Sequence, residues 1–364
     1  MSPPTSPPTG LPPTFVPGFH DEAAVRAMRY NPLGETGLYV SHLGCGGGVL
    51  SSLYGSFTEE ECIATIREAI RQGVNYIDTA PWYGQGRSED ILGKALKEVP
   101  RQAYYIGTKV GRYELDPRHM FDFSASKTRQ SIEKSLKLLQ LDYVDILQVH
   151  DVEFAPDPEM VVNETLPVVK EAVEAGKARF IGITGYPVSA LKDIITRSKD
   201  IRISTVLSYC RDTLIDSTLQ EYMPFFKERG VGVISASGPS MGLLTNAGPQ
   251  PWHPAPEELK EMCRRAAGYC ESQGVELGKL AVYHALTREG QATHLVGANC
   301  REVLRLNLRT LREGLTEAER QVLKHVKDRF FADLKVRHWE GKELREREAI
   351  LKELAEKEKL EGKS

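Results

Sequence analysis

Short apolar runs alternate with amphipathic stretches between about residue 40 and residue 300. The runs are rich in β-branched residues and are bounded by glycine or polar residues, a pattern typical of buried strands. Eight such runs predict eight strands. They are "VSHLGCG" from Val40, "VNYIDTA" from Val74, "AYYIGTKV" from Ala103, "VDILQVH" from Val144, "ARFIGIT" from Ala178, "RISTVLSY" from Arg202, "VGVISAS" from Val231 and "ATHLVGA" from Ala292.

Stretches with helical periodicity separate these runs. The segment from Thr58 to Glu61 has the signature of a capping box, and apolar residues recur on one face of the helix that follows until Gly73 ends it. Further helical stretches end at Gly176 and Gly230. Strands alternating with helices predict an α/β protein, and eight units favour a single-domain (β/α)₈ TIM barrel. An open, doubly wound sheet is the alternative.

The two ends of the chain depart from this pattern. Residues 1–20 are rich in proline and predict a disordered arm. The barrel is expected over residues 21–334. Residues 335–364 are highly charged and predict a solvated C-terminal helix. The N-terminus has no basic segment followed by an apolar stretch, so no secretory signal is expected.

Composition argues against several classes of protein. The 364 residues carry a formal net charge of −3, which gives no strong field for nucleic acid or anionic lipid. No apolar run approaches the ~18 residues of a membrane span. The six cysteines form no C-x-x-C pair and no zinc spacing, so reduced thiols, no metal and a cytoplasmic location are expected. The expected partner is a small molecule, and the chain is expected to be a monomer or weak homodimer.

Four ionisable residues fall at the ends of three consecutive predicted strands. Asp78 ends the second strand, Lys109 the third and His150 the fourth, and Tyr83 lies in the loop after the second. In a barrel these positions share one mouth, where active sites lie. Each residue alone has a structural explanation, such as a helix cap or packing. Together they indicate a site.

The four residue types have a joint chemistry. A nearby ammonium on Lys109 would stabilise the phenolate of Tyr83, and Asp78 would hold that ammonium in place. His150 would orient a substrate hydroxyl or carbonyl. Such a site moves a proton next to a carbonyl carbon. A Schiff-base role for Lys109 is disfavoured, because Asp78 would keep the amine protonated.

These motifs resemble those of the aldo-keto reductases. The resemblance covers Val40 to about Leu311 and is carried by "YIDTAPWYGQGRSEDILGKAL", "GTKVG", "VDILQVH" and "GKARFIGIT". It implies a barrel that binds NAD or NADP without a Rossmann domain. It also implies a catalytic tetrad, with the tyrosine as acid–base: Asp78, Tyr83, Lys109 and His150.

The resemblance also implies where the cofactor would bind. The glycines of "GCGGG" would let the backbone approach the nicotinamide, and the loop after the eighth strand resembles the family's adenosine loop. Gly297, Ala298 and Val303 stand where relatives hold the 2′-phosphate of NADP, and none can pair with it, so NAD is the expected cofactor. The implied contacts are Gly46, Gly47, Asp78, Thr184, Ser208, Ser237, Gly238, Gly297, Asn299, Arg301 and Asn307.

Three loops resemble a narrower group, the L-galactose and L-fucose dehydrogenases. They are "VHDVEF", "VLSYCRDTLID" and "SMGLLTNAGPQPWHPAP". The resemblance implies oxidation of the anomeric C1 hydroxyl of an aldose to a lactone. A general NADPH-dependent carbonyl reductase and a non-catalytic nicotinamide-binding regulatory subunit are the alternatives. The implied substrate-binding residues are Trp82, Tyr83, His150 and Trp252, with His253 as a further pocket wall.

Overall fold

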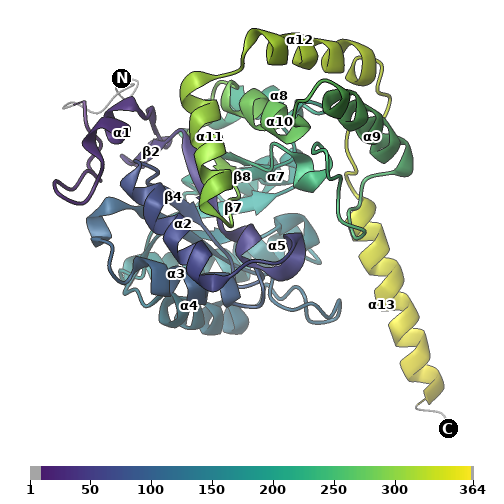
Figure 1. Cartoon of the computed structure of the whole chain (residues 1–364). Coiled ribbons are helices and arrows are strands. Elements are labelled where there is room, and N and C mark those ends of the chain that lie inside the picture. The colour runs from purple at the N-terminus through teal and green to yellow at the C-terminus, as the bar shows by residue number, and fades with distance from the viewer. Residues whose placement is uncertain (1–9, 362–364) are drawn as a thin grey trace.

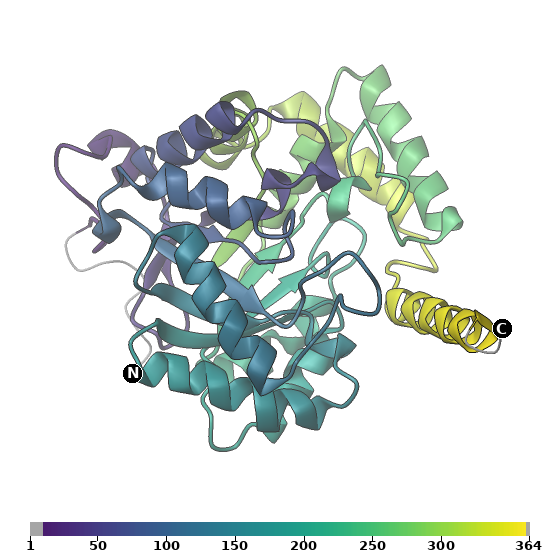
Figure 2. The ribbon, with the colours of Figure 1, turned by 90° about the horizontal axis from the view of Figure 1, so that it is seen from below.

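The structure, a computed structural model, describes residues 10–361, and its centre is a closed barrel of eight parallel strands. Helices surround the strands in both views (Figures 1 and 2). The (β/α)₈ prediction is therefore confirmed, and the open-sheet alternative is wrong. The barrel strands are β3 (Leu43–Gly46), β4 (Tyr76–Asp78), β5 (Tyr105–Val110), β6 (Val144–Val149), β7 (Ala178–Gly185), β8 (Thr205–Tyr209), β9 (Gly232–Ala236) and β10 (Thr293–Val296).

The helices follow the strands in the expected alternation, with extra helices at both ends of the chain. They are α1 (Glu22–Ala27), α2 (Glu59–Arg71), α3 (Arg87–Leu96), α4 (Ala125–Leu139), α5 (Pro158–Met160), α6 (Leu166–Glu174), α7 (Val188–Arg197), α8 (Thr218–Glu228), α9 (Glu257–Ser272), α10 (Leu277–Leu286), α11 (Arg301–Glu313), α12 (Glu317–Val326) and α13 (Lys342–Glu361).

Helix α2 begins and ends where its sequence predicts, but its capping box is incomplete. Thr58 is the N-cap and accepts a hydrogen bond from the backbone N–H of Glu61. Gly73, with φ of 95°, follows the last turn. The carboxylate of Glu61 does not return to Thr58. It bonds instead to Arg301, at the start of α11. A long-range ion pair has replaced a local cap.

The first predicted strand, from Val40, is two strands in the structure. Val40 lies in β2 (Tyr39–Ser41), which pairs antiparallel with β1 (Tyr30–Pro32), and only Leu43–Gly46 enters the barrel. Leu33, in the hairpin turn, is buried in a cluster with barrel residues. Leu33 approaches Gly232, at the start of β9, so closely that a side chain on Gly232 would clash with it. The hairpin thus covers the amino-terminal end of the barrel, opposite the mouth.

The segment just before α1 packs on the barrel. Thr14 is 2% exposed and accepts a hydrogen bond from Asn75 Nδ2 at 2.9 Å. Phe15, Val16 and Phe19 pack against the main core. The prediction that residues 1–20 form a disordered arm is therefore wrong for residues 10–20, because their apolar side chains find a surface to cover. Residues 1–9 lie outside the described part of the chain.

The carboxyl-terminal segment divides at a different place from the one predicted. Trp339 is 3% exposed and stacks on Tyr186, with ring centroids 4.9 Å apart. Glu340 pairs with the buried Arg211. The segment before α13 is therefore part of the barrel's packing, and the charged helix begins at Lys342 rather than at residue 335. From there α13 extends outward (Figure 1), and Arg347 and Glu358 along it contact Phe121 and Arg118 in the loop after β5.

Among residues 10–361, no helix is both long enough and apolar enough to cross a membrane.

Candidate active site

The four residues of the expected tetrad come together at the carboxyl-terminal mouth of the barrel. Asp78 is the last residue of β4, Lys109 lies in β5, and His150 directly follows β6. Tyr83 lies in the loop between β4 and α3, and its ring stands edge-on to His150 with centroids 5.8 Å apart. Strand order β4-β5-β6 places the three strand ends side by side, which explains why sequence spacing alone found them.

Lys109 connects the other members of this cluster. Its ammonium forms an ion pair with Asp78 Oδ1, donates to the carbonyl oxygen of Thr79 at 2.8 Å, and lies 3.3 Å from the hydroxyl oxygen of Tyr83. The side chains of Lys109 and Asp78 are 1% and 2% exposed. All three donor directions of the ammonium are thus used, which fixes its position relative to the phenol.

Sequence reasoning missed Gln148, which completes the support of Asp78. It lies in β6, pairs in register with Lys109, and donates from Nε2 to Asp78 Oδ2 at 2.7 Å. Both carboxylate oxygens of Asp78 are therefore bonded. Gln148 precedes His150 by two positions, so the alternation of side chains along a strand puts both on the same face and was the signal that could have found it.

Burial and charge set different protonation states for the three titrating groups. Burial alone would lower the pKa of Lys109, but Asp78 and Tyr83 raise it above its ordinary value, so the amine stays charged. Burial raises the pKa of Tyr83, and Lys109 offsets only part of that rise. Burial lowers the pKa of His150 to about 3, so its imidazole is neutral at pH 7. Lys109 therefore stabilises the phenolate, as expected, without bringing the pKa of Tyr83 below its ordinary value.

A charged and aromatic cluster adjoins the tetrad, and sequence reasoning missed two of its members. The guanidinium of Arg112 lies 3.8 Å from the ring centroid of Trp82 and 2.7 Å from Asp151 Oδ2. Trp82 in turn contacts Tyr83, with ring centroids 6.3 Å apart. Asp151 is 2% exposed at its side chain and has φ of 49°, a left-handed conformation that is uncommon outside glycine. Because Arg112 follows β5 and Asp151 follows β6, both occupy positions at the mouth.

The residues expected to hold the nicotinamide differ in whether their hydrogen-bonding groups are already bonded within the protein. Thr184 Oγ1 accepts the backbone N–H of Asp151 at 3.0 Å, so the Thr184 hydroxyl is already engaged. Ser208 Oγ is buried and has no hydrogen-bond partner among the described residues. Ser237 adopts φ of 58° directly after β9. The backbone N–H of Gly238 donates to His294 Nε2 at 3.2 Å and is not free for a ligand.

The glycines after β3 have a packing role that the sequence did not reveal. A side chain on Gly47 would stand 2.7 Å from Ser88 Oγ and 2.8 Å from the carbonyl oxygen of Asp78, so only glycine fits. A side chain on Gly46 would have room, because the nearest atoms to its Cβ position lie 3.8 Å away. At Gly48 the nearest atoms belong to the rings of Tyr54 and Tyr83, at 3.9 Å. A side chain at Gly48 would therefore lie in ordinary contact with the phenol ring of Tyr83.

The loop after β10 leads into α11. A side chain on Gly297 would come within 2.4 Å of Val49 Cγ1, so this position has no room for a longer residue. The carbonyl oxygen of Asn299 accepts from Cys62 Sγ at 3.4 Å. Arg301 is paired with Glu61, and Asn307 is 6% exposed in the second turn of the helix.

The two candidate pocket walls after β9 differ in accessibility. Trp252 is 45% exposed and meets Tyr54 edge-on, with ring centroids 5.6 Å apart. His253 is buried, donates from Nε2 to the carbonyl oxygen of Ser240 at 2.9 Å, and accepts from the backbone of Ala255. Both ring nitrogens of His253 are engaged, so it is a structural residue here.

The comparisons with known proteins agree with this geometry. The model of the aldo/keto reductase family matches residues 42–328. The chain belongs to the aldo-keto reductase family and is an oxidoreductase.

Its similarities within the curated proteins include two sugar dehydrogenases. The chain is 46% identical to L-galactose dehydrogenase from Arabidopsis thaliana over 267 residues, which cover 73% of this chain and 82% of that protein. It is 34% identical to D-arabinose 1-dehydrogenase from Saccharomyces cerevisiae over 286 residues, which cover 74% of this chain and 82% of that protein. Among solved structures, an aldo-keto reductase from Bacillus halodurans in its holo form superposes with a TM-score of 0.64 at 28% identity, over 82% of this chain and 96% of that chain.

Aldo-keto reductases use nicotinamide cofactors, and the residues at this mouth fit one. The unpartnered Oγ of Ser208 can bond a carboxamide, and Gly48 lies beside the ring of Tyr83 without a side chain of its own. No group of three or more His, Cys, Asp or Glu side chains within residues 10–361 could hold a metal ion.

Proposed function

We propose that this protein oxidises the C1 hydroxyl of a free aldose, such as L-galactose or L-fucose, to the lactone, with NAD as the preferred acceptor and Tyr83 as the acid–base. The observation that carries the proposal is the buried cluster in which Lys109 lies between Asp78 and Tyr83, with His150 neutral beside the phenol. The cluster combines Tyr83, which can carry a proton, with the uncharged ring of His150, which can form a hydrogen bond, at the mouth of the barrel.

The side chains divide the work of oxidation between them. When bound, the oxidised nicotinamide supplies the acceptor for the hydride that leaves C1 of the sugar. The oxygen of Tyr83, as phenolate, takes the proton of the C1 hydroxyl, so that one hydride and one proton are removed and the C1–O bond becomes a carbonyl. Lys109 stabilises the phenolate from 3.3 Å. The neutral ring of His150 hydrogen-bonds the same sugar oxygen and orients it.

Two observations support an aldose as the substrate. The relatives described above include an L-galactose dehydrogenase at 46% identity and a D-arabinose 1-dehydrogenase at 34%. The mouth beside Tyr83 is also charged, because Arg112 and Asp151 form a largely buried pair there. A substrate with several hydroxyl groups can add hydrogen bonds to these charged groups, which an apolar carbonyl compound cannot. Trp82, stacked under Arg112, and the exposed Trp252 are the proposed apolar walls.

The preference for NAD rests on the loop after β10. Gly297, Ala298 and Val303 offer no cation and no hydroxyl to a 2′-phosphate, and Val49 fills the space next to Gly297. Asn299, Arg301 and Asn307 are the proposed contacts to the adenosine end of the cofactor.

A general carbonyl reductase is the second candidate, and one observation favours it. The pKa of Tyr83 is raised, mainly by burial, so the phenol holds its proton at neutral pH and is ready to act as an acid toward a carbonyl oxygen. A non-catalytic nicotinamide-binding subunit is the third candidate, and the intact tetrad argues against it.

The test is a screen of free aldoses with NAD and with NADP, in which the absorbance of the reduced cofactor is followed. L-Galactose, L-fucose and D-arabinose are compared with their methyl glycosides, which lack the free C1 hydroxyl. We expect turnover with at least one free aldose, none with the glycosides, and a lactone as the product. Reduction of aldehydes with NADPH but no oxidation of any aldose would favour the second candidate. Cofactor binding without turnover in either direction would favour the third.

A further inference from the structure

We propose that Glu61 is the residue that discriminates against NADP, by occupying the one cation that the adenosine loop offers to a 2′-phosphate. The inference rests on the proposed function, because it takes the loop after β10 as the place where the adenosine end of the cofactor binds.

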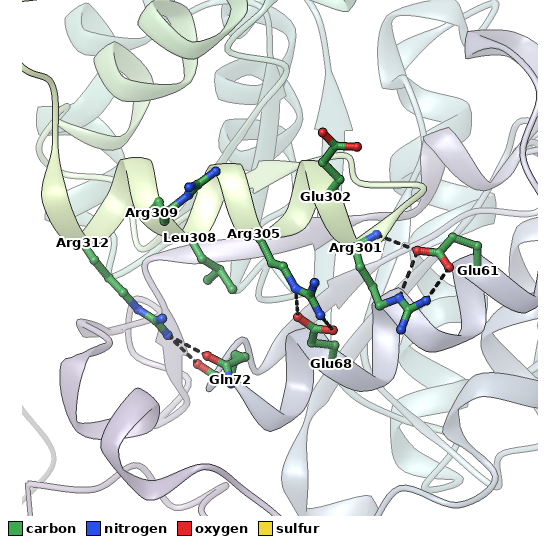
Figure 3. A pocket seen from close by; sticks show the side chains of 9 residues that line it. All are labelled: Glu61, Glu68, Gln72, Arg301, Glu302, Arg305, Leu308, Arg309 and Arg312. Carbon is green, nitrogen blue, oxygen red and sulfur yellow. Dashed lines mark hydrogen bonds and ion pairs between the residues drawn. The ribbon is translucent and has the colours of Figure 1, made fainter.

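The carboxylate of Glu61 contacts Arg301 at three points. Oε1 accepts from the backbone N–H of Arg301 at 3.0 Å and from its Nε at 3.1 Å, and Oε2 accepts from Nη2 at 3.0 Å. Hydrogen bonds from Arg301 lower the pKa of Glu61 below its ordinary value, so the carboxylate is charged at neutral pH. Figure 3 shows Glu61 reaching from α2 to the first residue of α11. Glu61 thus makes the contacts that a phosphate would make with the same residue.

Two other arginines of this surface, Arg305 and Arg312, are held in a similar way. A groove of about 660 Å³ runs between α2 and α11. Within it, Arg305 donates from Nε and Nη2 to Glu68 at 2.7 and 2.9 Å, and Arg312 contacts Gln72 (Figure 3). Glu68 lies seven residues after Glu61 on the same helix. The two glutamates therefore make matched pairs, but only Glu61 pairs with the adenosine loop.

A carboxylate at this place favours one cofactor over the other. It accepts a hydrogen bond from the 2′-hydroxyl of NAD, whereas it repels the doubly charged 2′-phosphate of NADP and leaves Arg301 no free donor on its bonded edge. Gly297, Ala298 and Val303, the other positions considered for the phosphate, carry no cation. The geometry therefore assigns cofactor choice to a residue of α2, not to the loop alone.

The experiment measures the Kd of NADH and of NADPH by fluorescence titration without sugar, for wild type, Glu61→Gln and Glu68→Gln. Gln at position 61 keeps an oxygen for the backbone N–H of Arg301 and removes only the charge. We expect Glu61→Gln to lower the ratio of the NADPH Kd to the NADH Kd by about tenfold or more, and Glu68→Gln to leave it within about twofold. The gain should disappear in Glu61→Gln/Arg301→Ala, because Arg301 is then absent. Glu61→Ser repeats the test if Glu61→Gln does not fold.

Three results would overturn the proposal. The first is a ratio unchanged within about twofold in folded Glu61→Gln and Glu61→Ser, the second an equal fall in Glu68→Gln, and the third an equally large fall when Arg301 is also removed. In each case the wild type still binds a dinucleotide, so the proposed function stands. If the wild type binds neither NADH nor NADPH, both the inference and the proposed function fail.

Discussion

Replacing Lys109 with methionine removes the ammonium at the centre of the tetrad while keeping the length of the side chain. Lys109 and Asp78 are 1% and 2% exposed, so Lys109→Met leaves a buried carboxylate without its cation. Breaking a buried ion pair on one side costs about 3–5 kcal/mol of unfolding free energy. The same change also removes the positive charge next to Tyr83. The substitution therefore has a structural effect and a chemical effect, and these can be separated.

The chemical effect follows from the distance between Lys109 and Tyr83. Two unit charges at the 3.3 Å between Lys109 Nζ and the phenol oxygen interact by roughly 5 kcal/mol at an effective dielectric constant of about 20. Only part of that charge develops on the phenol in the transition state, so the figure is an upper limit. A preorganised electrostatic contact of this kind is worth about 10²–10³-fold in kcat. We expect Lys109→Met to lose activity by that factor.

The assay compares Lys109→Met with Lys109→Met/Asp78→Asn. Unfolding free energies come from urea titrations, and kcat comes from aldose oxidation as a function of pH. The double variant should regain most of the lost stability, because no buried charge remains unpaired, and Gln148 can still donate to the new amide oxygen. Its kcat should stay low, and the limb over which kcat rises with pH, as Tyr83 becomes the phenolate, should move to higher pH, since nothing offsets the burial that raises the pKa of Tyr83.

Recovery of kcat together with stability in the double variant would refute this reasoning, because it would show that Lys109 acts only through the fold. If Lys109→Met unfolds with a free energy within about 1 kcal/mol of wild type, Asp78 does not depend on Lys109 for its charge compensation, which would also refute the reasoning.

The buried histidines, the amino-terminal segment and Trp339 each give a further prediction. Burial lowers the pKa of His150 and of His294 to about 3, so the unfolded chain binds protons that the folded chain does not. The free energy of unfolding should therefore be highest above pH ~6.5. Below that pH it should fall by about 1.4 kcal/mol per pH unit for each of the two histidines. Equal urea midpoints at about pH 7.5 and 5.5 would contradict this. Deletion of residues 1–20 should lower Tm, because Thr14 and the apolar side chains near it leave the barrel; an unchanged Tm would show that these contacts contribute nothing. Trp339→Ala should cost about 3 kcal/mol of unfolding free energy, because its stacking on Tyr186 is lost, whereas Leu360→Ala, in the exposed part of α13, should leave the urea midpoint unchanged; equal midpoints for the two variants would contradict this.

Local patterns were enough to predict the barrel and the four tetrad residues that meet at its mouth. The strands are continuous apolar runs because helices cover them, and the ends of parallel strands must share one edge. Asp78, Lys109 and His150 could therefore be grouped before any contact was known. Gln148 follows the same rule, since it lies two residues before His150 on one strand, but a glutamine carries no signal of its own in a buried run.

Contacts between distant parts of the chain could not be predicted in this way. Glu61 has the local signature of a capping box, yet it pairs with Arg301, 240 residues further on. Thr14 looks like part of a proline-rich arm, but Asn75 binds it across 61 residues. In both cases a contact with a distant residue forms in place of the contact that the local sequence predicts, and the neighbouring residues do not indicate that distant partner.

The measurement that tests the central claim most directly is the rate of NAD reduction by the best free aldose, in wild type and in Tyr83→Phe, with the dinucleotide Kd measured on both proteins. The substitution removes only the phenolic oxygen that lies 3.3 Å from Lys109. The account predicts a loss of at least about 10²-fold in kcat with the Kd within about twofold of wild type. Turnover by Tyr83→Phe within about tenfold of wild type would contradict it, because the proton would then have another acceptor.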